Sequence, residues 1–240
     1  MTTLLPVAIL AGGLATRLRP ATAVMPKSLM NIAGEPFIAH QLRLLQKNHI
    51  QRVVLCVGFL GEQIQEFVGD GRQFGLNVIY VSDGACLLGT GGAIKQALPL
   101  LGDTFFILYG DSYLPCDYLA VQTAFATSQQ LALMTVFKNQ GLWDTSNIEF
   151  HNGNIFSYDK KHPNARMQYI DYGLGVMTAR AMQYMPADEP YDLADFYQLL
   201  LARQLLAAYE VEQRFYEAGS FTGIEELQHY LRVEEMQWNS

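Results

Sequence analysis

Basic residues and paired glycines lie close together near the start of the chain, in the stretch LAGGLATRLRPATAVMPKSL that spans Leu10–Leu29. Gly12 and Gly13 carry no Cβ, so the backbone there can approach a flat or anionic ligand closely. Arg17 offers a planar fork of donors and Lys27 a compact charge, and both suit phosphate groups. The segment predicts a phosphate-binding loop, although each of these cations taken alone is more typical of a solvated surface loop.

An acidic residue follows one of the most apolar runs of the sequence. Asp111 comes directly after Thr104–Gly110, TFFILYG, so its carboxylate is expected at the carboxyl end of a parallel strand, where ligands bind in open α/β sheets. Mg²⁺ is usually held by one or two carboxylates together with phosphate oxygens. Asp111 is therefore a candidate metal ligand, and the alternative is that it caps the next turn.

Two common phosphate-binding motifs are absent from the sequence. No Gly-x4-Gly-Lys-Ser/Thr pattern occurs, which excludes a P-loop, and Gly89-Thr90-Gly91 is followed by Ile94 where the dinucleotide fingerprint needs a third glycine.

The first half of the chain predicts the elements that would position these residues. Apolar runs typical of strands buried on both faces alternate with segments of helical spacing. The predicted strands are Val7–Ala11, Val53–Gly58, Asn77–Val81 and Thr104–Gly110, and the predicted helices are Pro36–Asn48, Gly61–Gly71 and Gly91–Leu101. This alternation predicts βαβ units and a doubly wound, mostly parallel sheet.

The second half is more mixed. We expect a helix over Asp117–Ser128, a strand over Leu131–Phe137, a hairpin over Ser146–Asp159 that turns at Asn152-Gly153, a strand over Gln168–Thr178 and a helix over Tyr191–Gln204. The stretch Leu206–Gly219 is expected to form another hairpin, before a closing helix from Thr222 to about Val233. No linker or repeat divides the sequence, so one compact domain over residues 1–240 is the simplest organisation.

Composition and charge exclude several classes of protein. The net charge is −7, which argues against a nucleic-acid partner, and the apolar runs are too short for a membrane span. Without a secretory signal pattern, we expect a cytoplasmic protein. The three cysteines lie far apart and indicate neither a disulfide framework nor a zinc site. Aromatic residues of the second half are compatible with a homodimer contact or with cover for a sheet edge, and the sequence does not choose between them.

Taken together, the motifs resemble those of sugar-1-phosphate nucleotidyltransferases, also called nucleotide-sugar pyrophosphorylases. The resemblance rests on Gly12-Gly13-x2-Thr16-Arg17-Leu18-x-Pro20 with Pro26-Lys27, and on the stretches GEPFIAHQLRLL, LLGTGGAIKQAL, FFILYGDS, SYDKKHP and IDYGLGVM. It implies a Rossmann-like, GT-A-type α/β three-layer sandwich with a central, mostly parallel sheet and a small antiparallel sugar-binding part. Residues 1–115 would form the nucleotide-binding half and residues 116–240 the sugar-binding half.

The resemblance also implies roles in the nucleotide half. The backbone of Leu10, Ala11, Gly12 and Gly13 would hold the base and ribose, and Arg17 and Lys27 would bind the phosphates. Thr16 would also contact the nucleotide, and Gly89 and Thr90 belong to a second nucleotide loop. Asp111 and Glu217 would hold a Mg²⁺ cofactor. Glu217 lies in RFYEAGSFTGIEEL, where the family pattern has Asp, and Ser220 stands in place of Thr.

The resemblance also implies roles for residues in the sugar-binding half. Lys160 would neutralise the sugar phosphate, and Asp159 and Asp171 would accept hydroxyls of the sugar ring; Asn147 and Gly173 complete this set. The alternative for these residues is a solvated hairpin end. Catalysis would then rest on Arg17, Lys27, Asp111 and Lys160, because a sugar 1-phosphate is already a nucleophile near neutral pH and needs charge neutralisation and positioning more than a general base.

The partners implied are a nucleoside triphosphate and a sugar 1-phosphate, but their identities are open. Asp83 could accept two protons from guanine, which slightly favours GTP with a heptose or hexose 1-phosphate. A UTP-dependent N-acetylmuramate-1-phosphate uridylyltransferase is an alternative. Two others are an alcohol-phosphate cytidylyltransferase with an aromatic cage drawn from Tyr113, Trp143 and Tyr172, and a non-catalytic protein that binds nucleotide sugars.

Overall fold

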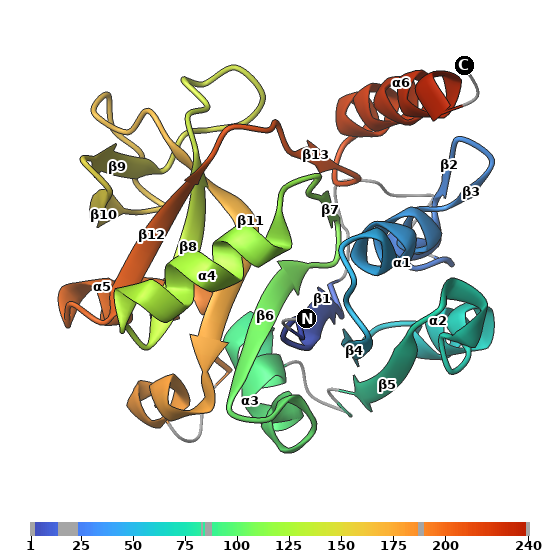
Figure 1. The fold of residues 1–240 in the computed structure, drawn as a ribbon, viewed down its shortest axis with the longest axis horizontal. Helices are drawn as coiled ribbons and strands as arrows, with labels where there is room; N and C mark the ends of the chain where they lie inside the picture. The colour runs from blue at the N-terminus through green and yellow to red at the C-terminus, as the bar shows by residue number, and fades with distance from the viewer. Residues whose placement is uncertain (1–2, 14–23, 83, 85–87, 187–189, 239–240) are drawn as a thin grey trace.

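A seven-stranded sheet in the order β12-β8-β11-β6-β1-β4-β5 forms the centre of the protein (Figure 1). The computed structural model describes residues 3–13, 24–82, 84, 88–186 and 190–238. The strands are β1 (Val7–Ala11), β4 (Arg52–Val57), β5 (Asn77–Ser82), β6 (Thr104–Tyr109), β8 (Ala132–Phe137), β11 (Ile170–Thr178) and β12 (Leu206–Val211). All neighbouring pairs are parallel except those of β11, which runs antiparallel to β6 and β8. The predicted parallel strands of the first half are thus confirmed.

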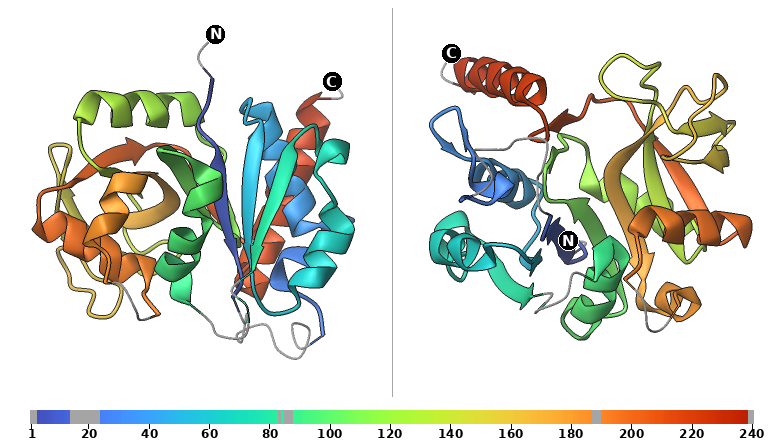
Figure 2. Two further views of the ribbon diagram at one scale, coloured as in Figure 1. Left: turned by 90° about the horizontal axis from the view of Figure 1, so that it is seen from below. Right: turned by 180° about the vertical axis from the view of Figure 1, so that it is seen from behind.

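Helices cover both faces of the sheet (Figure 2). α1 (Phe37–Lys47), α2 (Gly61–Val68) and α4 (Tyr118–Ser128) pack on one face, while α3 (Gly89–Leu101), α5 (Leu193–Ala202) and the 3-10 helix η5 (Ala179–Tyr184) pack on the other. Successive residues of β1 divide between the two cores, since Ile9 joins the first and Ala8 the second. The molecule is therefore the predicted three-layer α/β sandwich.

Three short ladders lie outside this sheet. β9 (Ile148–His151) and β10 (Asn154–Tyr158) form the predicted hairpin, whose turn residues Asn152 and Gly153 both have positive φ. β2 (Asn31–Ile32) pairs with β3 (Glu35–Pro36), and β7 (Ser112–Tyr113) pairs with β13 (Tyr216–Glu217). Two further 3-10 helices, η3 (Lys27–Leu29) and η4 (Arg72–Phe74), and the helix α6 (Phe221–Trp238) complete the described elements.

The hairpin predicted over Leu206–Gly219 is wrong. β12 instead joins the edge of the main sheet parallel to β8, and β13 pairs with β7. The connecting residues offer no glycine or asparagine for a tight turn, and Phe215 packs edge-on against Phe137 and Tyr172, which separates the two strands. The closing helix begins at Phe221, as expected, but continues to Trp238.

None of the helices in the described part of the chain combines the length and apolar character that a membrane crossing requires.

Candidate active site

The glycine segment after β1 lies between the ends of the two neighbouring strands. A Cβ at Gly58, which follows β4, would stand 2.8 Å from the Gly12 carbonyl oxygen. A Cβ at Gly110, which follows β6, would stand 2.9 Å from Ala11 Cα and would collide with the Leu10 carbonyl. At Gly13, by contrast, an added Cβ would meet open space. The carboxyl end of β1 is thus packed closely on both sides, whereas no described residue lies against the Cα of Gly13 on its side-chain face.

Sequence reasoning missed Gly58 and Gly110. The available signal was a glycine directly after each apolar strand that flanks β1. The predicted residues Thr16, Arg17 and Asp83 lie outside the residues that the structure describes.

Gly89 and Thr90 lie at the start of α3, after the loop that leaves the carboxyl end of β5. Thr90 Oγ1 accepts a hydrogen bond of 2.7 Å from the Leu193 N–H at the start of α5, and the Gly91 N–H donates to the Tyr191 carbonyl at 2.8 Å. A Cβ at Gly89, where φ is +73°, would stand 2.6 Å from the same carbonyl. In this structure these hydrogen bonds hold the start of α3 against the start of α5.

Lys27 and Asp111, which are 84 residues apart in sequence, form an ion pair with 2.7 Å between Lys27 Nζ and Asp111 Oδ2. Lys27 begins η3, and Asp111 separates β6 from β7. The Asp111 carbonyl accepts from the Ala218 N–H at 2.8 Å, and Ser112 pairs with Glu217 in the β7–β13 ladder. The structure therefore brings together Lys27, Asp111 and Glu217.

The Glu217 carboxylate is held close to the start of α6. It accepts hydrogen bonds from the Gly219 N–H and, at 2.5 Å, from Ser220 Oγ. Gly219 also adjoins Lys27, because a Cβ there would stand 2.8 Å from Lys27 Nζ. At Gly223 a Cβ would collide with the Glu217 carboxylate. The side chain of Glu217 thus folds into a space kept free by glycines.

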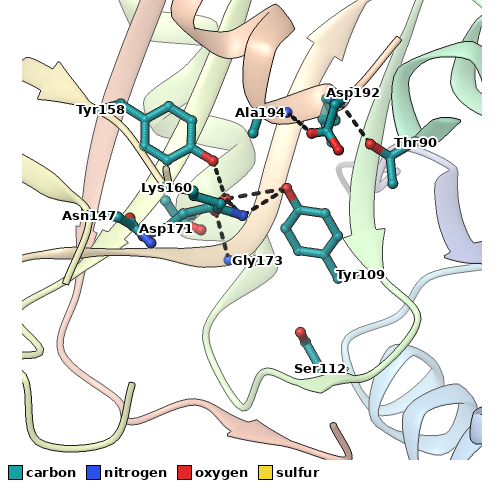
Figure 3. Close-up of polar contacts among 12 residues, drawn as sticks. Thr90, Tyr109, Ser112, Asn147, Tyr158, Lys160, Asp171, Gly173, Asp192 and Ala194 are labelled. Atoms are coloured by element: carbon teal, nitrogen blue, oxygen red, sulfur yellow. Dashed lines mark hydrogen bonds and ion pairs between the residues drawn. The ribbon is translucent and has the colours of Figure 1, made fainter. Parts of the chain in front are cut away.

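A second cluster surrounds Asp171, whose side chain is 3% exposed (Figure 3). Its Oδ2 receives Tyr158 OH at 3.0 Å and Tyr109 OH at 3.3 Å, and Lys160 Nζ lies 3.0 Å away. Its Oδ1 accepts from the Gly173 N–H at 3.1 Å. The carboxylate is buried, paired and hydrogen-bonded, as a buried charge must be.

Electrostatics in this cluster favour a charged lysine. Burial lowers the pKa of Lys160, but attraction to Asp171, with smaller contributions from Asp192 and Tyr197, outweighs it and leaves the pKa above its ordinary value. The Lys160 ammonium also lies 4.8 Å from the centre of the Tyr109 ring. Burial first, and then the Asp171 charge, hold the pKa of the Tyr109 phenol well above its usual range, so the phenol keeps its proton.

Two other predicted sugar residues support the cluster. Asn147 Oδ1 accepts from the Asp171 N–H at 3.1 Å, which fixes the backbone of β11 beside β9. Gly173 has φ +101° and interrupts the regular pairing of β11 with β8. A Cβ at Gly173 would stand 3.2 Å from Ser112 Oγ and 3.3 Å from the Tyr109 ring.

Asp159 is not brought to this cluster. Its Oδ1 accepts from the backbone N–H groups of Lys161 and His162 at 2.8 and 3.0 Å, and its Oδ2 lies 3.2 Å from His162 Nδ1. The carboxylate thus closes a local turn, and Asp159 lines a different hollow, beside α5 and β12.

One cleft of about 690 Å³ connects the Lys27–Asp111 pair with the Lys160–Asp171 pair. The predicted residues that line it are Lys27, Asp111, Asn147, Lys160, Asp171, Gly173 and Glu217. Lining residues that sequence reasoning missed are Tyr109, Ser112, Asp144, Thr145, Pro163, Ile170, Tyr172, Phe215 and Gly219. The usable signal for Tyr109 was its place at the end of the strand that leads to Asp111.

The donor set of this cleft fits a divalent cation that is shared with a substrate. Asp111 and Glu217 offer carboxylate oxygens, the ligands that Mg²⁺ prefers, and each retains lone pairs beyond its present hydrogen bonds. The described residues contain no group of three or more His, Cys, Asp or Glu that could hold a metal ion without further ligands. Phosphate oxygens of a bound substrate would have to complete the coordination.

Among the described residues, the three aromatic side chains considered for a cage pack against other rings and not against one another. Tyr113 packs against Tyr230 of α6, whereas Trp143 packs on Phe137 beneath Arg214. Tyr172 approaches Phe137 and Phe215.

Comparison with known proteins places this cleft in context. Residues 7–142 match the model of the nucleotidyl transferase family. An N-acetylmuramate alpha-1-phosphate uridylyltransferase of Neisseria meningitidis is 40% identical over 124 residues, which cover 51% of this chain and 52% of that protein. A UTP–glucose-1-phosphate uridylyltransferase of Synechocystis is 27% identical over 201 residues, 77% of this chain and 52% of that protein. Other curated relatives are named as thymidylyl- and guanylyltransferases.

The chain spans about half the length of these first two curated relatives. Among solved structures, HddC from Yersinia pseudotuberculosis complexed with GMP-PN superposes with a TM-score of 0.78 at 21% identity, over 95% of this chain and 100% of that one. At this identity the likeness shows a shared fold.

Proposed function

The chain belongs to the nucleotidyl transferase family, and from this premise we propose that it joins a nucleoside triphosphate to a sugar 1-phosphate. An oxygen of the sugar phosphate attacks the α-phosphorus of the triphosphate. The bond from that phosphorus to the bridging oxygen breaks, and pyrophosphate leaves with the electron pair. The product is a nucleoside-diphosphate sugar.

The observation that carries this proposal is the shared cleft. The cleft is lined by Lys27, which pairs with Asp111, and by Lys160, which pairs with Asp171. Two lysines in one cleft suit two phosphate-bearing substrates that must approach each other. The protein has a net charge of −7, so these two lysines supply positive charge for anion binding at the cleft that the overall charge does not predict.

We assign the nucleotide to the glycine segment and the sugar to the second half of the chain. Leu10 and Ala11 are paired with the neighbouring strands, so the nucleoside would lie against the exposed side of Gly12 and Gly13, and Lys27 would face the triphosphate. Lys160 keeps its proton and neutralises the sugar phosphate, so that two polyanions can meet. No proton has to be removed from the nucleophile, because the second phosphate pKa is about 6.

The structure changes the role that we propose for Asp171. Its carboxylate is already occupied by tyrosine hydroxyls, Lys160 and a backbone N–H, so it acts as the counter-charge of Lys160. We propose that Asn147, whose Nδ2 has only a long 3.5 Å contact to the Thr145 carbonyl among described residues, faces the sugar hydroxyls instead.

Asp111 and Glu217 would hold Mg²⁺ together with phosphate oxygens of the nucleotide. When bound, the cation would stabilise the charge that develops on the phosphates during transfer. For Asp111 to bind the cation, its ion pair with Lys27 has to break at least partly. The triphosphate then offers the Lys27 ammonium a stronger set of anionic partners.

For the substrates, we propose UTP first and GTP second. The Neisseria relative with 40% identity is named a uridylyltransferase acting on N-acetylmuramate 1-phosphate, and this favours UTP with an amino-sugar phosphate. The preference for GTP rests on Asp83, which lies outside the described residues, and on relatives named as heptose- and mannose-1-phosphate guanylyltransferases. Tyr113 packs against Tyr230 and Trp143 against Phe137, and this disfavours the aromatic cage of the alcohol-phosphate cytidylyltransferase alternative.

A pyrophosphate-release assay tests the proposal. The protein is incubated with Mg²⁺, each of the common nucleoside triphosphates, and a panel of sugar 1-phosphates that includes N-acetylmuramate, glucose, mannose and heptose derivatives. We expect pyrophosphate and a nucleotide sugar from at least one pair. Binding of a nucleotide sugar without turnover of any pair would instead favour the non-catalytic binding protein.

A further inference from the structure

A buried glutamine reaches from α1 to the loop that carries Asp111. Gln41 is 1% exposed, and its Nε2 donates to the Tyr109 carbonyl at 3.0 Å and to the Ser112 carbonyl at 2.8 Å. These two carbonyls lie on either side of Gly110 and Asp111. One side-chain amide therefore bridges the backbone across the acidic residue.

Two further backbone groups of this loop are held by other elements. The Gly110 N–H donates to the Leu10 carbonyl of β1 at 3.0 Å, and the Asp111 carbonyl accepts from the Ala218 N–H at 2.8 Å. These contacts tie the loop to the nucleotide segment on one side and to the Glu217 strand on the other. Gln41 supplies the third attachment, from beneath.

The direction of the amide is determined by its surroundings. Turning it over would place the amide oxygen against two carbonyl oxygens, which repel it. In the observed direction Gln41 Oε1 is buried and finds no donor among the described residues. A buried polar atom without a partner is unfavourable and calls for a reason. The two hydrogen bonds made by Nε2 provide that reason.

We propose that Gln41 is a positioning residue that sets the direction of the Asp111 carboxylate toward the shared cation. This inference rests on the proposed function, because it assigns Asp111 to Mg²⁺. Gln41 does not itself line the cleft; it acts through Tyr109 and Ser112, which do. Loss of its two donors frees the Tyr109–Ser112 loop and turns the carboxylate away from Glu217.

Gln41→Met tests the inference, because methionine has a similar length but no donor. We expect the Mg²⁺ concentration for half-maximal activity to rise, or kcat to fall, by about 10- to 100-fold, as for groups that orient metal ligands. KM for the nucleotide, measured at saturating Mg²⁺, should stay unchanged. Electron paramagnetic resonance of Mn²⁺ with the nucleotide present should show weaker Mn²⁺ binding, a readout that does not require turnover.

Two controls separate positioning from loss of stability. Gln46→Met changes an exposed glutamine on the same helix and should alter nothing. Leu45→Ala removes a fully buried side chain of α1, so it should lower the melting temperature while Mn²⁺ binding to the folded protein is kept. If Gln41→Met does not fold, Gln41→His, which retains one ring donor, takes its place.

A folded Gln41 variant with wild-type Mn²⁺ affinity and wild-type Mg²⁺ requirement overturns the inference. So does an equal loss of Mn²⁺ binding in Leu45→Ala. Wild-type protein that binds Mn²⁺ and nucleotide but never releases pyrophosphate would sink the proposed function, and the Mn²⁺ comparison between variants would still decide the role of Gln41.

Discussion

Asp171 and Lys160 act as one unit in the part of the cleft that we propose for the sugar phosphate. The buried carboxylate keeps the lysine charged, and the tyrosines around it stay protonated because burial and the nearby Asp171 charge raise their pKa values. A lysine with a raised pKa contributes its ion pair fully below its ordinary pKa of about 10.4 and loses it as the pH rises through the higher, folded-state value. Phosphate binding should therefore persist into the alkaline range.

Asp171→Asn tests this coupling. The change removes the attraction that raises the pKa of Lys160, while burial continues to lower it, so the lysine should lose its proton at lower pH. We expect the alkaline fall in kcat/KM for the sugar 1-phosphate to move to lower pH than in wild type. Asp159→Asn, outside the cleft, is the matched control and should keep the wild-type profile. An unshifted profile in Asp171→Asn would contradict the pairing.

Asp111→Asn should lower the rate of catalysis without a large change in the stability of the fold. The Lys27–Asp111 pair is partly exposed, so its loss should change the free energy of unfolding by no more than about 1 kcal/mol. We expect kcat to fall about a hundredfold or more, because the charge that would hold the cation is lost. Pyrophosphate release and urea unfolding measure the two effects. Asp103→Asn, at an exposed position outside the cleft, should leave both unchanged.

At the scale of elements, an interruption in the strand β11 positions residues of the cleft. Between Asp171 and Gly175 its pairing with β8 shifts, and Gly173 takes φ +101° so that its N–H reaches the Asp171 carboxylate. Gly173 also lies against Ser112 and Tyr109, the residues on either side of Gly110-Asp111. The bulge therefore connects the Lys160–Asp171 pair with the loop that carries Asp111.

Gly173→Ala should destabilise the protein. An alanine at this φ is strained and its Cβ would press on the Tyr109 ring, so we expect a loss of about 1–3 kcal/mol in urea unfolding. Gly153→Ala, in the exposed hairpin turn where an added Cβ meets open space, isolates the cost of positive φ alone. A loss at Gly173 no larger than at Gly153 would contradict the tight contact.

Sequence patterns predicted most elements because their signals are local. Adjacent residues alone are enough to recognise the apolar runs of β1, β4, β5 and β6 and the turn at Asn152-Gly153. Strand partners are not local, so the pairing of β12 with β8 and of β13 with β7 could not be read from Leu206–Gly219. The same limit applies to side chains. That Asp159 caps a turn while Asp171 neutralises Lys160 depends on which residues surround each carboxylate.

At the scale of the molecule, the sheet brings segments from both halves of the chain to one cleft. β6 and β11 run side by side in opposite directions at the centre of the sheet, so Asp111 after β6 meets Asp171 near the start of β11. This arrangement explains why Lys27 and Lys160, far apart in sequence, line the same cleft. It supports direct transfer, in which both substrates are bound together and no covalent intermediate forms on the protein.

Exchange of labelled pyrophosphate into the nucleoside triphosphate tests direct transfer most directly. With Mg²⁺ and the nucleotide that supports turnover, but without sugar 1-phosphate, we predict no exchange, because the α-phosphorus has no acceptor. Adding the sugar 1-phosphate should produce exchange together with the nucleotide sugar. Exchange in the absence of the sugar phosphate would contradict the account, since it would require a nucleotidyl group held covalently by the protein.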